Sequence, residues 1–303
     1  MVERTERVEQ LLNFTRALIS GKPGNPLIDK YKSYIDTVNH TETMVVLDIL
    51  IKEGMPVETV KEWVPKILNV FYNSLISYEW EPPSKEHFLY YLMEENRELD
   101  KILDEIKGIS KEAFKNDDVE LFGKLRELLT GLVTYELHYI KKENILFPYI
   151  EKAFEGHRCL SVMWSFHDDY RAGLKVLDNL LEEPLKNKQE ISREIGKLFF
   201  VLKPIIFREE QIVFPVALNA IPQKDWDEML NQSHNVGWCY ITPPSQKSDN
   251  IKGGEAILHS DIIDLETGLL VPNQIKWILN TIPVDMTYID ENDEVKFFSN
   301  GEH

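Results

Sequence analysis

The sequence predicts a mainly α protein: an antiparallel four-helix bundle, preceded by a small helical domain and followed by a short α+β C-terminal segment. Apolar residues recur at helical spacing over four long segments, which short polar turns separate: residues 86–107, 118–153, 160–182 and 189–220. A short phrase also occurs twice, as ENILFP at 143–148 and as EQIVFP at 210–215, 67 residues later. A repeat of this kind predicts two similar helical hairpins that face each other.

The first 82 residues are expected to form the small helical domain. Helical periodicity runs from Val8 to Leu18, stops at a Gly- and Pro-rich stretch, and resumes over 42–53 and 57–78. The sequence EPPS at 81–84 marks a boundary, with a serine that could cap the next helix. The bundle is therefore predicted to occupy residues 83–235.

The amino-acid composition of the chain changes after the bundle. Residues 236–263 are rich in Pro, Ser, Gly and polar side chains and are expected to be a linker. In the remaining segment, 264–303, a helix is predicted at 272–280. Two strands, at 285–289 and 294–298, flank the polar sequence DEND, which indicates a β-hairpin.

Composition narrows the class of protein. The 303 residues include 34 basic and 51 acidic ones, for a net charge of −17. Nucleic acids and anionic membranes require clustered Lys and Arg, so neither is expected as a partner. The two cysteines, Cys159 and Cys239, form no close-spaced pair, and no apolar run approaches the roughly 18 residues of a membrane helix. Together with a charged N-terminus, these features predict a cytoplasmic protein.

The repeat predicts a metal site in the core of the bundle. When the hairpins are aligned, positions 96 and 167, 138 and 205, and 143 and 210 are equivalent and are expected to point inward. Asn96 and Ile205 occupy two of these six positions, and two histidines and two glutamates occupy the other four: His138, Glu143, His167 and Glu210. His and carboxylate side chains together suit iron, manganese or zinc, and bundle cores hold such ions with ligands from facing helices. This set is enough for one ion rather than two.

Other interpretations of the same residues stay open. Each histidine alone could be a core residue with satisfied hydrogen bonds, and each glutamate could be solvated. Glu209, four residues after Ile205, is the alternative carboxylate of the second hairpin. A bundle without metal could bind a protein partner or a second copy of the chain and relay a signal. A carboxylate-bridged oxidase needs two metal ions, and the ligand count argues against it, so no enzyme is predicted.

At these residues the chain resembles the hemerythrin-like, or HHE cation-binding, family. The matching segments are HYIKKENILFP at 138–148, MWSFHD at 163–168 and EEQIVFP at 209–215. The resemblance covers about residues 85–235 and implies a four-helix bundle that holds a non-haem di-iron centre. Three of the family's ligand positions fall on Asn96, Lys142 and Ile205 in this chain. A reduced ligand set is therefore implied, with non-haem iron as the metal, or manganese or zinc.

The layout of the whole chain resembles a prokaryotic subgroup of that family. In this subgroup a short helical domain precedes the bundle and a PAS sensor domain follows it. Residues 28–78 are similar to the N-terminal domain, and residues 265–303 are similar to the opening of a PAS domain, which would be partial here. The resemblance implies a cytoplasmic protein with a sensory or regulatory role in signalling, which binds a metal ion.

Overall fold

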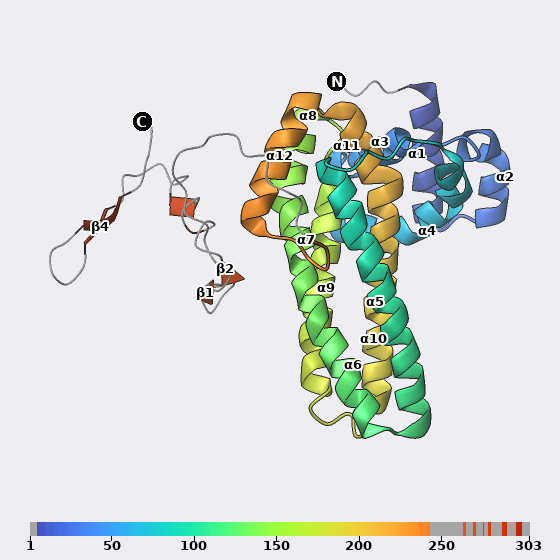
Figure 1. Cartoon of the computed structure of the whole chain (residues 1–303). Helices are drawn as coiled ribbons and strands as arrows, with labels where there is room; N and C mark the ends of the chain where they lie inside the picture. Colours follow the sequence, from blue (N-terminus) through green and yellow to red (C-terminus); the bar gives the residue numbers. More distant parts are fainter. Residues whose placement is uncertain are drawn as a thin grey trace. The chain divides into compact units, whose positions relative to one another are not determined.

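The computed structural model describes residues 5–242 and, beyond them, residues 263–264, 269–270, 275, 278–279, 287–289 and 295–298. The chain divides into two compact units, residues 1–246 and 247–303. All the regular structure described in the first unit is helical (Figure 1).

Four helical rods form an antiparallel bundle in the first unit. The first rod is α5 (Phe88–Asn116), and the third is α9 (Leu160–Leu180). The second rod is a succession of α6 (Val119–Gly131), η1 (Leu132–Tyr135), α7 (Glu136–Lys141), η2 (Lys142–Leu146) and α8 (Phe147–Ala153). The fourth is made of α10 (Lys188–Arg208), η3 (Glu209–Val213) and α11 (Phe214–Ala220). A further helix, α12 (Gln223–Val236), packs against α5 and α7. The predicted bundle is confirmed.

The N-terminal helices lie against one end of this bundle (Figure 1). They are α1 (Glu6–Ile19), α2 (Gly24–Ile35), α3 (His40–Lys52) and α4 (Val57–Ser77). Helix α3 packs on η3 and α11, while α4 packs on α9 and η3. Buried apolar residues of these helices and of the bundle form one continuous core. None of the described helices combines the length and the apolar composition that a bilayer-spanning segment requires.

Two helices differ from the sequence-based expectation. Helix α5 continues through residues 108–110, where a turn was predicted, and ends at Asn116. The reason is that its buried face continues with Ile106, Ser110 and Ala113, so one glycine does not interrupt it. Helix α2 was not predicted, because it begins inside the Gly- and Pro-rich stretch at 21–26 and is largely polar, although its buried residues are spaced four apart as in a helix: Leu27, Tyr31 and Ile35.

Both copies of the repeated phrase fold as a π-helical turn. The turn η2 ends where the Phe147 N–H donates to the carbonyl of Lys142, and η3 ends where the Phe214 N–H donates to that of Glu209. These hydrogen bonds span five residues instead of four. A proline follows each phenylalanine and has no N–H to donate, so a regular helical ladder is interrupted here in any case. The repeat therefore encodes a matched local widening of the two rods.

In the second unit, the structure describes two short antiparallel strand pairs. Strands β1 (Ile263–Asp264) and β2 (Leu269–Leu270) form one pair. Strands β3 (Thr287–Ile289) and β4 (Val295–Phe298) form the other, with Tyr288 opposite Phe297, at the position of the predicted hairpin. Much of 243–303, including most of the predicted helix and PAS-like segment, lies outside the described residues. The α+β character of this segment and the bounds of the four predicted segments stay predictions.

Candidate site in the core of the bundle

A cluster of charged and polar side chains is buried where the two π-helical turns face each other. We call it the polar centre, and its members are Glu95, Asn96, His138, Lys141, Lys142, Glu143, His167 and Glu209. Seven of these residues have no solvent exposure, and Glu143 is 7 % exposed. They come from α5, α7, η2, α9 and η3, so every rod of the bundle contributes.

The ammonium group of Lys142 lies at the middle of the polar centre. It donates a hydrogen bond to Glu209 Oε1, and it lies 3.0 Å from Nε2 of His167. The ring of Tyr139 stacks on His167, with the ring centroids 4.0 Å apart, and the Lys142 Nζ lies 4.4 Å from the centroid of the same ring. Lys142 is thus bonded to a carboxylate and to an imidazole, and covered by an aromatic face.

Glu209 is the carboxylate that joins the two hairpins. Its Oε2 atom lies 3.1 Å from Nε2 of His138 and accepts a hydrogen bond of 2.9 Å from the Asn96 side-chain amide. The Asn96 carbonyl in turn accepts a 2.5 Å hydrogen bond from the hydroxyl of Tyr135, whose ring stacks on His138. Glu209 therefore has a partner for each oxygen, which a buried carboxylate requires.

Glu95 is the second carboxylate that binds both a histidine and a lysine, and it lies at the α12 side of the polar centre. Its Oε2 lies 2.8 Å from Nδ1 of His138, and its Oε1 accepts a 2.7 Å hydrogen bond from Lys141. The backbone after α12 completes the site: Cys239 donates its N–H to Glu95 Oε1 at 2.9 Å, and the carbonyl of Gly237 accepts from Lys141 at 2.7 Å. Residues 237–239 therefore close the α12 side of the polar centre through their backbone.

Glu143 lies on the other side of His167, at the edge of the polar centre. Its Oε1 accepts a 2.6 Å hydrogen bond from Nδ1 of His167, and its Oε2 accepts one of 2.9 Å from Arg171. Since Nδ1 of His167 donates, its Nε2 presents a lone pair to the ammonium group of Lys142. This fixes one neutral tautomer for the His167 ring.

The π-helical turn η2 explains how adjacent side chains all enter the core. In a regular α-helix, consecutive residues are about 100° apart, so three successive residues span more than half of the circumference. Here Lys141, Lys142 and Glu143 are all buried and bind Glu95, Glu209 and His167, respectively. The junction of α7 with a wider turn lets the rod present these three charged groups to the interior.

Buried charges in the polar centre are balanced in pairs. Glu95 pairs with Lys141, Glu209 with Lys142, and Glu143 with Arg171. Burial by itself would raise the pKa of Glu209, but the charges of Lys142 and His138 and their hydrogen bonds lower it to about 2. Burial lowers the pKa of Lys142, and Glu209 opposes this shift. The three carboxylates are matched by three cations even without a charge on His138.

Burial and neighbouring cations keep His167 neutral. Burial lowers its pKa well below the usual value, and the charges of Lys142 and Arg171 lower it further. Glu143, although paired, has a raised pKa because burial outweighs the effect of Arg171.

Comparison with protein families identifies this part of the chain. Residues 87–217 match the family described as Hemerythrin HHE cation binding domain. They form a hemerythrin-like domain. The match contains all eight members of the polar centre and ends within α11. A comparison of the chain with curated proteins gave no match.

The four predicted ligands do not converge on one point in the hemerythrin-like domain. His138 faces Glu95 and Glu209, whereas His167 faces Lys142 and Glu143. Glu210 is only partly buried, and its contact in the cluster is the Asn96 amide at 3.4 Å. The ligand set of His138, Glu143, His167 and Glu210 stays a prediction.

The residues of the polar centre do not fit a metal ion in this arrangement. Among the described residues, no group of three or more His, Cys, Asp and Glu side chains is placed to hold one. The charge balance gives the physical reason, because a divalent cation needs anionic ligands that are not already neutralised. The ammonium group of Lys142 also lies between His167 and Glu209, within bonding distance of both.

Sequence reasoning missed two members of the polar centre and the backbone that closes it. Glu95, Lys141 and the backbone of residues 237–239 were not expected there, and Glu210 was ranked above Glu209. One signal could have found Glu209: it is equivalent to Lys142 in the repeat, and a lysine and a glutamate at facing positions are complementary. No pattern predicts the return of the chain after α12, because this contact depends on tertiary structure.

Proposed function

We propose that the hemerythrin-like domain uses the ammonium group of Lys142 as a built-in cation and works without a metal ion. On this proposal the protein is a helical regulatory module that relays a signal between its N-terminal helices and the core of the bundle. The observation that carries the proposal is the position of Lys142 Nζ, which is bonded to Glu209 and lies 3.0 Å from Nε2 of His167.

The internal repeat supports this assignment. Lys142 and Glu209 are equivalent positions, 67 residues apart, and they are in direct contact. Two carboxylates at such facing positions would repel each other unless a cation lay between them. A lysine at one of the two positions provides this positive charge as part of the chain.

Energetic considerations suggest a structural role for the built-in cation. A buried ion pair adds little net stability, because desolvation offsets the attraction, but removal of one partner costs about 3–5 kcal/mol. The pair therefore specifies how the four rods pack. If Lys142 or Glu209 moves, the other is left buried without its partner, and the packing of the rods must change. This property suits a module that transmits a conformational change.

Contacts of the N-terminal helices support the relay. Lys61 of α4 donates to the Ser165 carbonyl and hydroxyl, at 3.0 and 2.8 Å, and to Asp169 at 2.8 Å. Ser165 and Asp169 flank His167 on α9. Helix α3 packs on η3, the turn that carries Glu209. The N-terminal helices thus touch two of the elements that hold the polar centre.

Metal content tests the built-in cation. We expect the wild-type protein, purified without an affinity tag and incubated with Fe²⁺, Mn²⁺ or Zn²⁺, to retain less than about a tenth of an equivalent after desalting. Lys142→Glu removes the ammonium group and restores a carboxylate at the family's ligand position, so it is expected to retain about one equivalent. Lys152→Glu on α8 makes the same change of charge outside the polar centre and should retain none. Elemental analysis measures all three.

Stoichiometric metal in the wild-type protein would contradict the proposal. It would favour the second candidate, a non-haem metal site of His138, Glu143, His167 and Glu210, whose cation displaces the ammonium group of Lys142. The description of the matched family as cation-binding favours this candidate. Its metal would then be lost in both His138→Ala and His167→Ala. Iron as that metal, a protein partner or homodimer, and the PAS-like segment stay predictions, and we propose no catalytic role.

Hydrogen exchange followed by mass spectrometry tests the relay. Lys142→Met leaves Glu209 without its cation, and we expect faster amide exchange in α3 and α4 as well as in the bundle. Lys203→Met is the control, since Lys203 lies outside the polar centre and pairs with Asp100 and Asp104 of α5. Faster exchange confined to residues 88–220 would show that the N-terminal helices do not respond.

A further inference from the structure

Residues 237–240, which we call the strap, cover the polar centre at its α12 side. The carbonyl of Gly237 accepts a 2.7 Å hydrogen bond from Lys141. The N–H of Cys239 donates one of 2.9 Å to Glu95. Helix α12 ends before the strap begins, so these bonds are tertiary contacts and not part of a helix or a strand.

Two aromatic side chains of the strap add to this cover. The ring of Trp238 lies against the ammonium group of Lys141, with the ring centroid 4.5 Å from Nζ. The ring of Tyr240 stacks on Tyr135 at a centroid distance of 6.2 Å, and Tyr135 stacks on His138 at 4.6 Å. The strap therefore contacts Lys141 directly and His138 through one intervening ring.

Two features of the strap are unfavourable in this closed position. Tyr240 has a φ of 62°, in the left-handed region that a bulky side chain rarely adopts. The indole Nε1 of Trp238 is buried and has no hydrogen-bond acceptor among the residues that the structure describes, although most buried donors have one. Both features would be relieved if the strap left the core, because the Tyr240 backbone could relax and the indole could bind water. Strained segments with few contacts are the ones that open locally in native proteins.

We propose that the strap opens and closes as a unit while the four rods of the bundle stay folded. In the open state, Glu95 and Lys141 reach solvent at the α12 side, and the thiol of Cys239 is no longer covered. The chain continues from the strap into the second unit, residues 247–303. The strap is thus a covalent link between that unit and the polar centre, and it adds a C-terminal input to the proposed relay. This opening does not depend on whether Lys142 replaces a metal ion.

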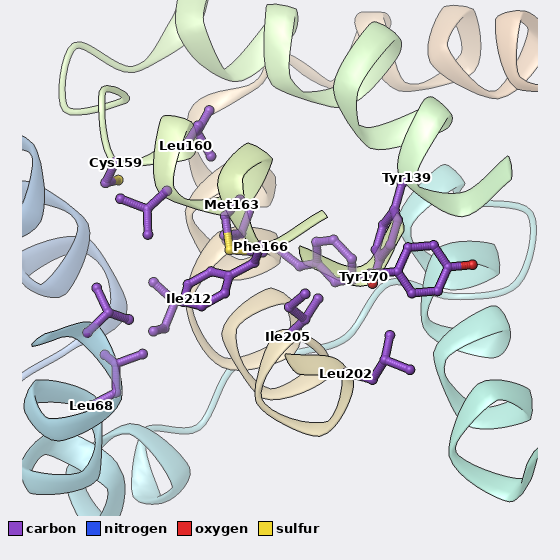
Figure 2. Packing of buried hydrophobic residues seen from close by; sticks show 14 of the residues in the cluster. Leu68, Tyr139, Cys159, Leu160, Met163, Phe166, Tyr170, Leu202, Ile205 and Ile212 are labelled. Carbon is purple, nitrogen blue, oxygen red and sulfur yellow. The ribbon is translucent and has the colours of Figure 1, made fainter. Parts of the chain in front are cut away.

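The two cysteines of the chain allow the opening to be measured. Cys239 lies in the strap and has no solvent exposure, while Cys159 is 7 % exposed. Figure 2 shows Cys159 next to Leu160, at the start of α9 and within the hydrophobic core. An alkylating reagent should therefore reach Cys159 only when this core opens, whereas it should reach Cys239 whenever the strap opens.

Pulsed alkylation of the full chain with iodoacetamide, followed by mass spectrometry of the two cysteine peptides, tests the strap. At reagent concentrations where the rate is proportional to the concentration, we expect Cys239 to react at least about ten times faster than Cys159. Below the unfolding transition, urea should change the Cys239 rate little, because the opening of four residues exposes little surface. Equal rates for the two cysteines, or an equal dependence on urea, would overturn the proposal.

Two substitutions of similar expected cost separate strap opening from global unfolding. Tyr240→Phe removes the hydroxyl that donates to the Gly131 carbonyl, so it weakens the closed strap, and Cys239 should react about two to five times faster. Ile191→Val removes a buried methyl group from the first turn of α10, at the opposite end of that helix from η3, and promotes global unfolding by a similar factor. Because the open strap leaves α10 folded, Ile191→Val should not change the Cys239 rate.

The responses to these two substitutions decide the outcome. The proposal fails if Ile191→Val accelerates the alkylation of Cys239 as much as Tyr240→Phe does, since Cys239 would then be exposed only by global unfolding. It also fails if Tyr240→Phe has no effect. Stoichiometric metal in the wild-type protein would contradict the proposed function without altering these comparisons, so the two proposals fail independently.

Discussion

At the scale of single residues, the pair of Lys142 and Glu209 explains why this bundle tolerates so many buried charges. Each carboxylate of the polar centre has a cation within hydrogen-bond distance of one oxygen. The other oxygen binds His138 in Glu95, His138 and Asn96 in Glu209, and His167 in Glu143. A network that is satisfied in this way fixes one arrangement of side chains, whereas a partly satisfied one would be costly.

His87 gives a prediction about pH at the same scale. It caps α5 through a 3.2 Å hydrogen bond from the Leu89 N–H to its Nδ1, and its ring lies 4.6 Å from that of Trp226. Burial lowers the pKa of His87 to about 4, with Asp227 opposing the shift. The unfolded chain, with a histidine pKa near 6.5, therefore binds a proton that the native state does not.

The free energy of unfolding should consequently fall as the pH drops below about 6.5. Between pH 7.5 and 5.5, we expect this loss to be about 1 kcal/mol larger in the wild type than in His87→Asn, which keeps a capping acceptor but does not titrate. Urea denaturation at the two pH values measures the difference. Equal losses in both proteins would show that His87 does not couple to folding.

From the sequence, we could predict which residues are buried in the core better than which residues they bind. His138, His167 and Glu143 are buried in the bundle as expected, because they lie on an inward face of long amphipathic segments. Their bonds to Lys142, Glu95 and Arg171 could not be derived from spacing, since they depend on how two widened turns face each other. The buried residues were therefore predicted and their hydrogen-bond partners were not, while their role as metal ligands stays a prediction.

At the scale of elements, the matched π-helical turns are the main departure from an ideal bundle. Periodicity places four rods correctly, but it assumes 3.6 residues per turn throughout. A turn with an extra residue changes which side chains point inward from that position onward. Lys142 and Glu209, the first residues of the two turns, meet in the polar centre.

Gly237, which ends α12, gives a prediction at this scale. Its dihedral angles, φ 97° and ψ 176°, lie in a region that is essentially restricted to glycine. We expect Gly237→Ala to lower the free energy of unfolding by about 1–3 kcal/mol, because the strain displaces the carbonyl that binds Lys141. Chemical denaturation measures this change.

Gly196→Ala is the matched control for this substitution. Gly196 lies inside α10, where an added Cβ would meet no atom within 4 Å. Alanine favours a helix over glycine, so this variant should be more stable by up to about 1 kcal/mol. If both substitutions have the same effect, the backbone of Gly237 is not under the constraint described.

At the scale of the whole molecule, the N-terminal helices and the bundle share one hydrophobic core. Their boundary was expected near residue 82, which would suggest two separately folding domains. The boundary itself stays a prediction, and the described residues up to 242 lie in one compact unit, with polar bonds such as Arg158 to Asp48 across this junction. We therefore predict that α1–α11 unfold in a single cooperative transition.

Hydrogen exchange during a thermal ramp measures this cooperativity on the full chain. Peptides from residues 6–77 and from 88–220 should lose protection at the same temperature, because neither part keeps its core when the other unfolds. Loss of protection in the N-terminal helices several degrees before the bundle would contradict the prediction. In that case the boundary near residue 82 would separate independent domains.

The return of the chain after α12 has a mechanical consequence. The Gly237 carbonyl and the Cys239 N–H bind Lys141 and Glu95 directly, and the Tyr240 hydroxyl donates to the Gly131 carbonyl at 3.0 Å. Tension applied to the chain beyond residue 242 would load these three hydrogen bonds before it reached any long rod of the bundle. A pull from the C-terminal side would thus open the polar centre first and leave the outer helices in place.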